Sequence, residues 1–483
     1  MPKRNLIWIA AILLAAMLIM WGAWNHWPSA GGNGWGTPSP SGHAARLIRE
    51  NWLGEIDEDD LHRVALQAMV DQLDEHTSLM SPEAVGELAR RLEGTVNGFG
   101  LALYEADGAV VVAAPVYDSS AYHAGILPGD QIVEINGRPA ESVLPSGWGR
   151  GGDGRPRAYA PLCSIYAAGE ESGDEIELKI VRSGKQLPPV TLGRRKSPLE
   201  TVTGLARGKD GRWIYTVDRA GEVAYIRISE FTNRSTADDL QRVMRELPHI
   251  RKLVVDLRDN PGGPLDVAVG IADMFLREGP IVTQLSAKSP PREYVAGKDL
   301  TFHPDVAVVV LINAGTASAA EIVAGALAYN ARAVLVGEPT NGKRTIQEML
   351  PLPGGWQLNL TTSRYVFGAT VADQPSRPGL VDHQPIAPQA PVEMAPEQAL
   401  ELRRLRMVAA LGPHAKAAHL LGGPCPPDLE PDPQTVLAEL IEMDVQLREA
   451  ADLLNSPEQM EEILEAARAR KESDSAAAEA RRR

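Results

Sequence analysis

The sequence contains very little cysteine. Only Cys163 and Cys425 occur in 483 residues, and neither belongs to a CxxC motif or to a cluster of His and Cys. Structural zinc sites and disulfide frameworks both need several cysteines at short spacings, so the sequence predicts neither. One disulfide between the two cysteines stays open.

Positive charge is also scarce. Lys and Arg together number 48 against 63 Asp and Glu, which gives a net charge of −15, and no basic stripe occurs in the body of the chain. Nucleic-acid-binding proteins need a basic surface for the phosphates, so nucleic acid is not a predicted partner. Disorder is excluded as well, because 44% of the residues are hydrophobic and the length leaves room for several domains.

An uncharged run lies near the N-terminus. It extends from Leu6 to Trp24 and follows Lys3 and Arg4. The run is just long enough to span a bilayer as a helix, and the basic flank predicts that the N-terminus faces the cytoplasm. A cleaved signal peptide is the main alternative, but the Trp-rich end of the run lacks an AxA site. We therefore predict a transmembrane signal anchor over residues 1–27 and a flexible linker, rich in Gly, Ser and Pro, over residues 28–42.

The stretch from Val306 to Gln347 carries the main candidate for chemistry. An apolar run leads into a turn of small residues, and an amphipathic segment follows, which predicts a strand, a tight turn and a helix. Ser318 stands at the start of that helix, where backbone N–H groups without intrahelical partners can stabilise an oxyanion. Lys343 follows in a turn rich in Gly and Pro. A lysine whose pKa is lowered by burial can act as the base for such a serine.

Plainer interpretations and one competing motif apply to the same residues. A serine at a helix start is most often only an N-cap, and a lysine after glycine is usually a solvated turn residue. Residues Gly337 to Lys343 also spell GxxxxGK directly after a predicted strand, which is the pattern of a phosphate-binding loop. That loop needs Ser or Thr next and then a helix, whereas Arg344 follows here and the chain continues as a predicted strand. The sequence therefore favours the Ser/Lys interpretation over a nucleotide site.

Three motifs in this part of the chain resemble those of a known peptidase family. Residues 313–322 follow the pattern NxGxASAxEI, residues 337–343 follow GExTxGK with Gln347 behind them, and residues 256–263 follow DLRxNPGG. Together they resemble the carboxyl-terminal processing peptidases, the S41 class of Ser/Lys proteases. The resemblance implies a crotonase-like α/β core and a serine endopeptidase that needs no metal or other cofactor.

The resemblance also assigns individual residues. It implies that Ser318 is the nucleophile, that Lys343 is the general base, and that Gln347 orients the lysine. It further implies that the backbone N–H groups of Gly263 and Ala319 form the oxyanion hole.

The region from Gly94 to Leu192 resembles a PDZ domain. Alternating strands and a HAGILPGD turn follow a segment similar to the carboxylate-binding loop of such domains. The loop residues are Gly98, Phe99, Gly100 and Leu101. Successive backbone N–H groups in such a loop cradle a terminal carboxylate while the peptide adds to a sheet edge. A Gly/Arg/Pro-rich insertion between Ser142 and Ser172 interrupts the pattern, and we predict that it is a surface loop.

Other segments are assigned structural roles. Asp256 and Arg258 look catalytic in isolation, but we predict that they form a structural ion pair. His76, in a stretch similar to the LDPHSSYM segment of the same peptidases, is also predicted to be structural. After Pro396 the resemblance fades into amphipathic helical patterns, and a charged tail begins at Ser456. We predict that this tail is solvated or depends on a partner.

These observations predict a multidomain α/β protein. The expected parts are a transmembrane helix (1–27), a linker (28–42), a helical subdomain (43–93), a PDZ domain (94–195), a peptidase core (200–395) and a helical C-terminal extension (396–483). We expect a serine endopeptidase that recognises protein or peptide substrates by their free C-termini. Its single membrane pass would lie in the inner (cytoplasmic) membrane, with the catalytic part on the periplasmic or extracytoplasmic side. A catalytically silent PDZ adaptor for C-terminal peptides is the alternative, and the C-terminal helices are candidate surfaces for a partner or for self-association.

Overall fold

The computed structural model describes residues 40–482, with gaps at 144–173, 298–301, 368–383 and 413–432 and at the single positions 56, 107, 209, 219, 233, 287 and 303. The chain divides into two compact units, Met1–Glu75 and His76–Arg483, and each is described by itself. The predicted anchor and both cysteines lie outside the described residues. Among the helices that the structure describes, none is long and apolar enough to cross a membrane.

The first unit contributes two helices, α2 (Pro40–Asn51) and α3 (Glu58–Val70). Their apolar residues recur at the three- and four-residue spacing that predicted helices here. The helical pattern continues into the second unit as α4 (Pro82–Leu92), which begins after Ser81. The Ser81 side chain accepts a hydrogen bond from the Ala84 N–H at 3.3 Å, so it caps the helix as Ser commonly does.

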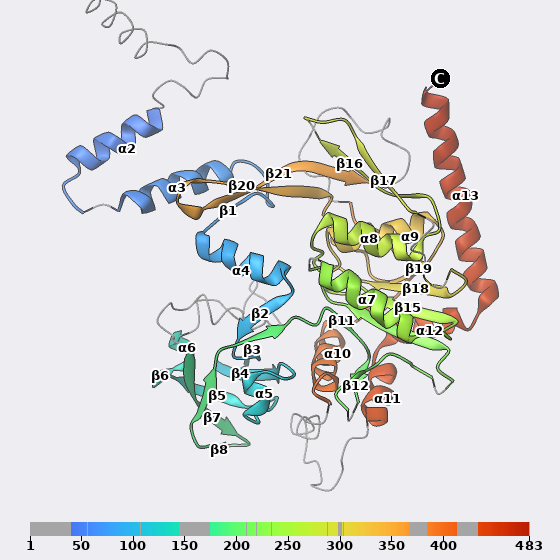
Figure 1. The fold of residues 1–483 in the computed structure, drawn as a ribbon, viewed down its shortest axis with the longest axis horizontal. Coiled ribbons are helices and arrows are strands. Elements are labelled where there is room, and N and C mark those ends of the chain that lie inside the picture. The colour runs from blue at the N-terminus through green and yellow to red at the C-terminus, as the bar shows by residue number, and fades with distance from the viewer. Residues whose placement is uncertain are drawn as a thin grey trace, which may run out of the picture. The chain divides into compact units, whose positions relative to one another are not determined.

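A seven-stranded sheet forms a β domain within the second unit (Figure 1). The strands β3 (Leu101–Ala106), β4 (Ala109–Pro115), β5 (Gln131–Ile135), β7 (Glu175–Arg182) and β8 (Lys185–Gln186) lie in this order, with β6 (Arg138–Pro139) beside β5 and β9 (Val190–Gly193) beside β7. Alternate residues, such as Ile176, Leu178 and Ile180 in β7, are buried in one core, which explains the alternating pattern of the sequence. In the sheet as described, β3 is an edge strand.

The α/β core is built on a second sheet. Its strands lie in the order β11 (Val202–Thr203), β14 (Val223–Ile228), β15 (Lys252–Asp256), β18 (Ala307–Ile312), β19 (Val334–Gly337) and β22 (Ala390–Pro391). The pairs from β14 to β22 are parallel, whereas β11 is antiparallel to β14. Parallel strands need long crossovers, and these contain the helices α7 (Arg234–Glu246), α8 (Leu265–Phe275) and α9 (Ala319–Tyr329).

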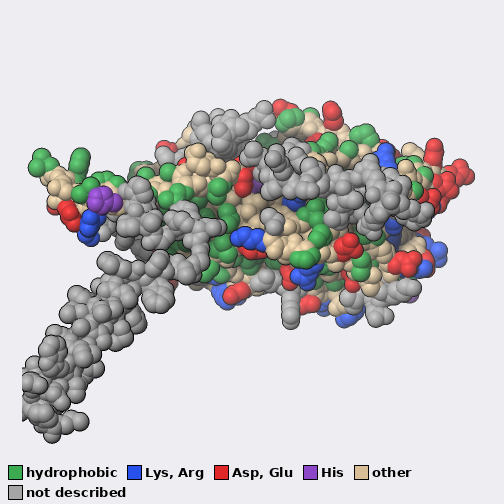
Figure 2. Space-filling model, turned by 90° about the horizontal axis from the view of Figure 1, so that it is seen from above, with side chains coloured by type: hydrophobic (Ala, Val, Ile, Leu, Met, Phe, Trp, Pro, Cys, Tyr) green, Lys and Arg blue, Asp and Glu red, His purple; other side chains and the backbone are tan. Residues whose placement is uncertain are grey.

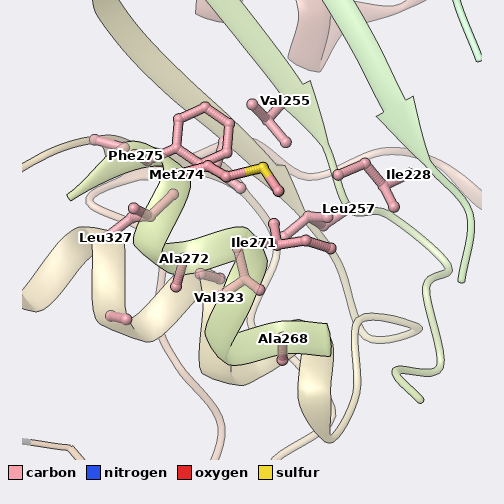
Figure 3. Packing of buried hydrophobic residues seen from close by; sticks show 14 of the residues in the cluster. Ile228, Val255, Leu257, Ala268, Ile271, Ala272, Met274, Phe275, Val323 and Leu327 are labelled. Carbon is pink, nitrogen blue, oxygen red and sulfur yellow. The ribbon is translucent and has the colours of Figure 1, made fainter. Parts of the chain in front are cut away.

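Each face of this parallel sheet has its own hydrophobic core, because successive strand residues point to opposite sides. On one face Val255 packs with Ile271 and Phe275 of α8, as Figure 3 shows. On the other face Val254 and Val309 pack with α12 (Val445–Leu454) and α13 (Pro457–Arg482). The core is therefore a three-layer structure with helices on both faces of the sheet.

The turns of the DLRxNPGG and NxGxASAxEI motifs follow neighbouring strands. Asp256, the last residue of β15, pairs in register with Leu311 of β18. The segments 256–263 and 313–318 therefore leave the sheet at the same edge. Crevices form at such carboxyl ends of parallel strands, which places both turns where an active site is expected.

A third, antiparallel sheet contributes the remaining part of the candidate site. Its strands lie in the order β1 (Ser78–Met80), β21 (Gln357–Val366), β16 (Pro280–Ser286) and β17 (Arg292–Val295), and β20 (Thr345–Pro351) pairs with β21. Because β20 begins directly after Arg344, Lys343 leads into a strand, as the sequence predicted. A phosphate-binding loop would need a helix at this point, so the nucleotide alternative is wrong.

The C-terminal extension is integrated into the core. Its helices are α10 (Pro396–Ala409), α11 (Pro433–Met443), α12 and α13. The amphipathic pattern predicted after Pro396 is divided at Asp444, whose side chain caps α12 by accepting a hydrogen bond from the Leu447 N–H at 3.0 Å. Leu453 is buried against the sheet, and Met460 of α13 joins the same core. The prediction that the tail is solvated or depends on a partner does not hold for the first turns of α13, because they pack against the chain's own core.

The surface of the described residues carries charges of both signs. Acidic and basic side chains are interspersed over the face shown in Figure 2. This mixture agrees with the net charge of −15 in arguing against a phosphate-binding surface on that face.

Candidate active site

Ser318 occupies the sharp turn between β18 and α9. Its φ of 53° and ψ of −120° lie outside the conformations that residues other than glycine commonly adopt. The turn is fixed by Thr316, whose hydroxyl donates to the Leu257 carbonyl at 2.8 Å, and by Ala317, whose N–H donates to the Asn260 carbonyl at 2.9 Å. A strained backbone of this kind costs about 1–3 kcal/mol and marks a candidate functional position.

A buried carboxylate connects this serine to the segment that precedes the lysine. Glu321 has an exposed fraction of 0% and accepts a hydrogen bond from the Ser318 N–H at 2.8 Å. Its other oxygen accepts from the Thr340 hydroxyl at 2.6 Å and from the Gly342 N–H at 2.8 Å. Three donors satisfy the carboxylate, as a buried charge requires. The turn of Ser318 and the loop of Lys343 are therefore held by one side chain.

A second side chain spans the same two segments. The Tyr365 hydroxyl lies 3.0 Å from the Ser318 carbonyl oxygen and 2.7 Å from the Lys343 carbonyl oxygen. With one proton it can donate to only one of them at a time. Burial, with the nearby negative charge of Glu321 as a further cause, raises the pKa of Tyr365 well above its ordinary value. The phenol therefore stays protonated and remains a donor to these carbonyls.

Lys343 and Gln347 lie on consecutive parts of the chain. Lys343 is partly buried and stands in the loop between β19 and β20, directly after Gly342, which has a φ of 92°. Gln347 lies in β20 at a register shift, and its amide nitrogen donates to the hydroxyls of Thr345 and Thr361 at 2.9 and 3.0 Å. These bonds fix the orientation of the Gln347 side chain. Its predicted interaction with the Lys343 amine stays a prediction.

The paired glycines of the turn after β15 lie against Ser318. A Cβ atom on Gly262 would lie 2.8 Å from the Ala319 nitrogen and 3.1 Å from the Ser318 Cβ, so only glycine fits there. The Gly262 N–H donates to the Asn260 side chain at 2.8 Å. A donor to an oxyanion from this pair would therefore come from Gly263, with Ala319 at the start of α9 as its predicted partner.

Beneath this turn lies a buried ionic network. Arg258 donates to both oxygens of Asp256, at 3.0 and 2.7 Å, and to both oxygens of Asp444, at 2.8 and 2.7 Å. Arg406 bridges the same two carboxylates with one nitrogen, 3.0 Å from each. The Tyr225 hydroxyl donates to Asp256 at 2.6 Å. The predicted ion pair of Asp256 and Arg258 is confirmed, but it is part of a larger network.

The charges of the network set the ionisation of its carboxyl groups. Burial raises the pKa of Asp256 and of Asp444, but the guanidinium groups of Arg258 and Arg406 more than reverse this effect. The net pKa of Asp444 lies below its ordinary value, and that of Asp256 lies well below it. Both carboxylates therefore stay charged at neutral pH.

A second arginine of α10 reaches the same turn. Arg403 donates to Asp259 at 2.6 Å, and the Asn313 side chain donates to the same carboxylate oxygen at 3.0 Å. Burial raises the pKa of Asp259, but Arg403 and Arg227 reverse the effect, so the net pKa is lowered. Asp259 has a φ of 61°, so these contacts hold another strained residue.

Sequence reasoning did not find several of these residues. It assigned no roles to Glu321, Tyr365, Arg406 or Asp444. One signal was available for the last two: Arg258 follows a buried strand, and the five donors of a buried guanidinium need more than one carboxylate. The sequence did not show which distant residues would provide the remaining acceptors.

The predicted carboxylate-binding loop lies in the β domain. Phe99 and Leu101 are buried in its core, and Gly100 has a φ of 77°. A Cβ atom on Gly100 would lie 2.0 Å from the Ser119 side chain, so this position requires glycine. The loop, which also contains Gly98, leads directly into the edge strand β3.

A metal site is not seen in the part of the chain that the structure describes. No group of three or more His, Cys, Asp or Glu side chains there could hold a metal ion.

Comparisons with known proteins identify relatives of this chain. A model of peptidase family S41 matches residues 222–372. A "Carboxy-terminal-processing protease" from Bartonella bacilliformis is 28% identical over 396 residues, which cover 80% of this chain and 84% of that protein. A "Carboxyl-terminal-processing protease" from Synechocystis is 32% identical, with 62% of this chain and 66% of that protein covered. The solved structure of a photosystem II D1 C-terminal processing protease is 25% identical and covers 76% of this chain and 90% of its own, with a TM-score of 0.40.

The lowered pKa values predict an acid-sensitive fold. Asp256, Asp259 and Asp444 have folded pKa values below the unfolded value of about 3.9. As pH falls, the unfolded chain therefore takes up protons first, and the free energy of unfolding decreases. We expect this free energy, measured by urea unfolding, to be nearly constant from about pH 6 to 8 and to fall below about pH 5. Asp444→Asn should be less stable at pH 7 and show a shallower decrease below pH 5. An equal decrease in the variant and the wild type would contradict the network's role.

Proposed function

This chain belongs to peptidase family S41 as a carboxy-terminal processing serine protease, and from that premise we propose that Ser318 and Lys343 form its catalytic dyad. One observation carries the proposal: the strained serine at the start of α9 and the loop before the lysine share the buried carboxylate of Glu321. Two groups that exchange a proton must be held at a fixed distance from each other. Glu321 holds both segments in place, and this supports the dyad. Residues 306–347 contain no histidine, which suits a lysine base.

In the proposed mechanism neutral Lys343 takes the proton of the Ser318 hydroxyl as the oxygen attacks the substrate carbonyl. The resulting oxyanion accepts hydrogen bonds from the N–H groups of Ala319 and Gly263. The C–N bond then breaks, the lysine ammonium gives its proton to the leaving amine, and Ser318 retains the acyl group. Water attacks this ester, loses a proton to Lys343, and releases the new C-terminus as Ser318 regains its hydrogen. Gln347 orients the lysine amine in this scheme.

The β domain supports the finer proposal that residues 94–195 are a PDZ domain attached to a crotonase-like core at 200–395. Its loop 98–101 contains a turn that requires glycine at position 100, and the edge strand β3 begins at Leu101. An extended substrate tail can add to such an edge while its terminal carboxylate binds the loop. We propose that this domain selects substrates by their free C-termini.

The dyad is tested by turnover of an unfolded reporter protein with an apolar free C-terminus. Ser318→Ala and Lys343→Ala should each lower kcat by at least about 10³-fold, because the members of a catalytic unit act together. Lys288→Ala, which removes an exposed lysine after β16, is the matched control and should keep full activity. If the wild type binds the peptide but does not cleave it, the adaptor alternative is favoured.

Recognition of the C-terminus is tested with paired reporters that carry a free or an amidated terminus. Amidation removes the charge that the 98–101 loop is proposed to bind. Hydrogen bonds to a charged group contribute about 1.5–3 kcal/mol, so kcat/KM should fall roughly 10- to 100-fold. Equal rates on the two reporters would count against a PDZ role in substrate selection.

We also propose that the uncharged run from Leu6 to Trp24 anchors the protein in the inner membrane with the protease on the extracytoplasmic side. The support is the length of the run and its basic flank at Lys3 and Arg4. The full-length chain should stay with the membrane pellet after carbonate extraction and be degraded by external protease in spheroplasts. Release of the intact chain by carbonate would contradict the anchor.

A further inference from the structure

We propose that the C-terminal extension completes the active site, with Asp444, Arg403 and Arg406 acting as positioning residues for the turn at 256–263. The inference rests on the proposed function, because the turn is assigned there to the oxyanion hole. None of the three side chains is proposed to touch the substrate. They act on the backbone that faces Ser318.

The turn at 256–263 and the turn of Ser318 form one backbone unit. The Asn260 carbonyl accepts from the Ala317 N–H at 2.9 Å, and the Leu257 carbonyl accepts from the Thr316 hydroxyl at 2.8 Å. Gly262 lies directly against Ser318. A displacement of the turn at 256–263 therefore shifts the Gly263 N–H relative to the Ser318 hydroxyl.

The glycines of this turn cannot fix its position by themselves. Gly262 and Gly263 have φ values of 97° and 150° and no side chains with which to pack. Glycine also leaves the largest number of alternative backbone conformations open. The Gly262 carbonyl accepts a hydrogen bond from the Phe231 N–H at 2.8 Å. The side-chain contacts that help to set the position of the turn come from the residues before it, from Asp256 to Asn260.

Those residues are held by the extension. Asp256 and Arg258 are bound by Asp444 at the start of α12 and by Arg406 of α10, through the contacts of 2.7–3.0 Å described above. Arg403 binds Asp259 one turn earlier on the same helix. Residues three apart lie on one face of a helix, so a single face of α10 contacts both ends of the segment 256–259.

The chemistry of the network favours a positioning role over stabilisation alone. Buried ion pairs are weak contributors to stability, because desolvation offsets most of their attraction and apolar residues of similar volume often stabilise as well. Bidentate guanidinium–carboxylate contacts, by contrast, fix direction and distance. The Tyr225 hydroxyl and the Gln446 side chain form hydrogen bonds with the same cluster, and Arg227 lies 3.4 Å from Asp256.

The experiment compares kcat per active serine in the full-length, detergent-solubilised chain. Active serines are counted by complete labelling with a fluorophosphonate probe, so a fraction of unfolded protein lowers the count without lowering kcat per site. Asp444→Asn keeps the cap of α12 but places an amide NH₂ group beside Arg258 and Arg406. We expect kcat per site to fall about 10- to 100-fold, as for a misplaced oxyanion donor, with KM little changed. The affinity for a peptide boronate that forms a tetrahedral adduct with the serine should fall in parallel with kcat.

A destabilised control variant separates positioning from stability. Leu453→Ala removes a buried side chain of α12, which costs roughly 2–5 kcal/mol of stability, but leaves the network intact. It should lower the number of active serines and leave kcat per site at the wild-type value. A lower kcat per site in Leu453→Ala, equal to that in Asp444→Asn, would overturn the proposal.

Arg403→Lys tests the same positioning role and can be used if Asp444→Asn does not fold. Arg403 is 40% exposed, so the change is tolerated by the fold, but the lysine cannot reproduce the guanidinium contacts to Asp259. Its kcat per site should fall by about 3- to 10-fold. Arg468→Lys, in the exposed pair with Glu461 on α13, is the matched control and should be unchanged.

Failure of the positioning role and failure of the catalytic dyad give different results in these experiments. Wild-type kcat per site in both Asp444→Asn and Arg403→Lys would overturn the positioning role and leave the protease assignment intact. Absence of both labelling and turnover in the wild type would overturn the dyad and, with it, this inference.

Discussion

The arrangement of the active site depends on one buried carboxylate. Glu321 lies in the first turn of α9 and accepts hydrogen bonds from the Ser318 N–H, the Thr340 hydroxyl and the Gly342 N–H. The Ser318 N–H follows β18, whereas the other two donors lie in the loop after β19. The carboxylate therefore fixes the end of β18 relative to that loop. Without it, the N–H groups of Ser318 and Gly342 would lose their acceptor, at a cost of up to about 1–3 kcal/mol each.

The packing of the helix that follows Ser318 offsets the strain in the backbone of Ser318. Residues Ala319 to Leu327 of α9 are all buried between the parallel sheet and its neighbours. Full burial of Ile322, Val323 and Leu327 contributes roughly 1.5–3 kcal/mol for each side chain, which exceeds the roughly 1–3 kcal/mol of strain at one residue. The packing of an apolar helix thus stabilises the strained backbone conformation of Ser318. This coupling ties the geometry of the site to the stability of the core.

Sequence patterns were informative wherever the relevant contacts are local. The strand at 307–312, the turn of Ser318 and the helix after it follow from periodicity and small residues within one segment. Lys343 is a candidate base from the sequence because its glycine-rich turn is a recognisable motif. Tyr365 was not found, because a tyrosine in a strand is ordinary, and only the fold brings its hydroxyl to the carbonyls of Ser318 and Lys343. Asp444 was missed for the same reason, since 186 positions separate it from Arg258.

The residues that the sequence did not reveal are polar side chains on buried faces, and their partners lie far away in the chain. Periodicity reports which face of an element is buried, but a polar residue on a buried face looks like an isolated exception until its partner is known. Arg258 is such an exception, because a fully buried guanidinium next to a single aspartate is under-satisfied. Its remaining acceptors had to come from another element, and here they come from the part of the chain where the family motifs end. The end of the sequence resemblance therefore does not mark the end of the structural unit. The helices after Pro396 pack on one face of the sheet and also contact the segment that leads to Gly262 and Ser318.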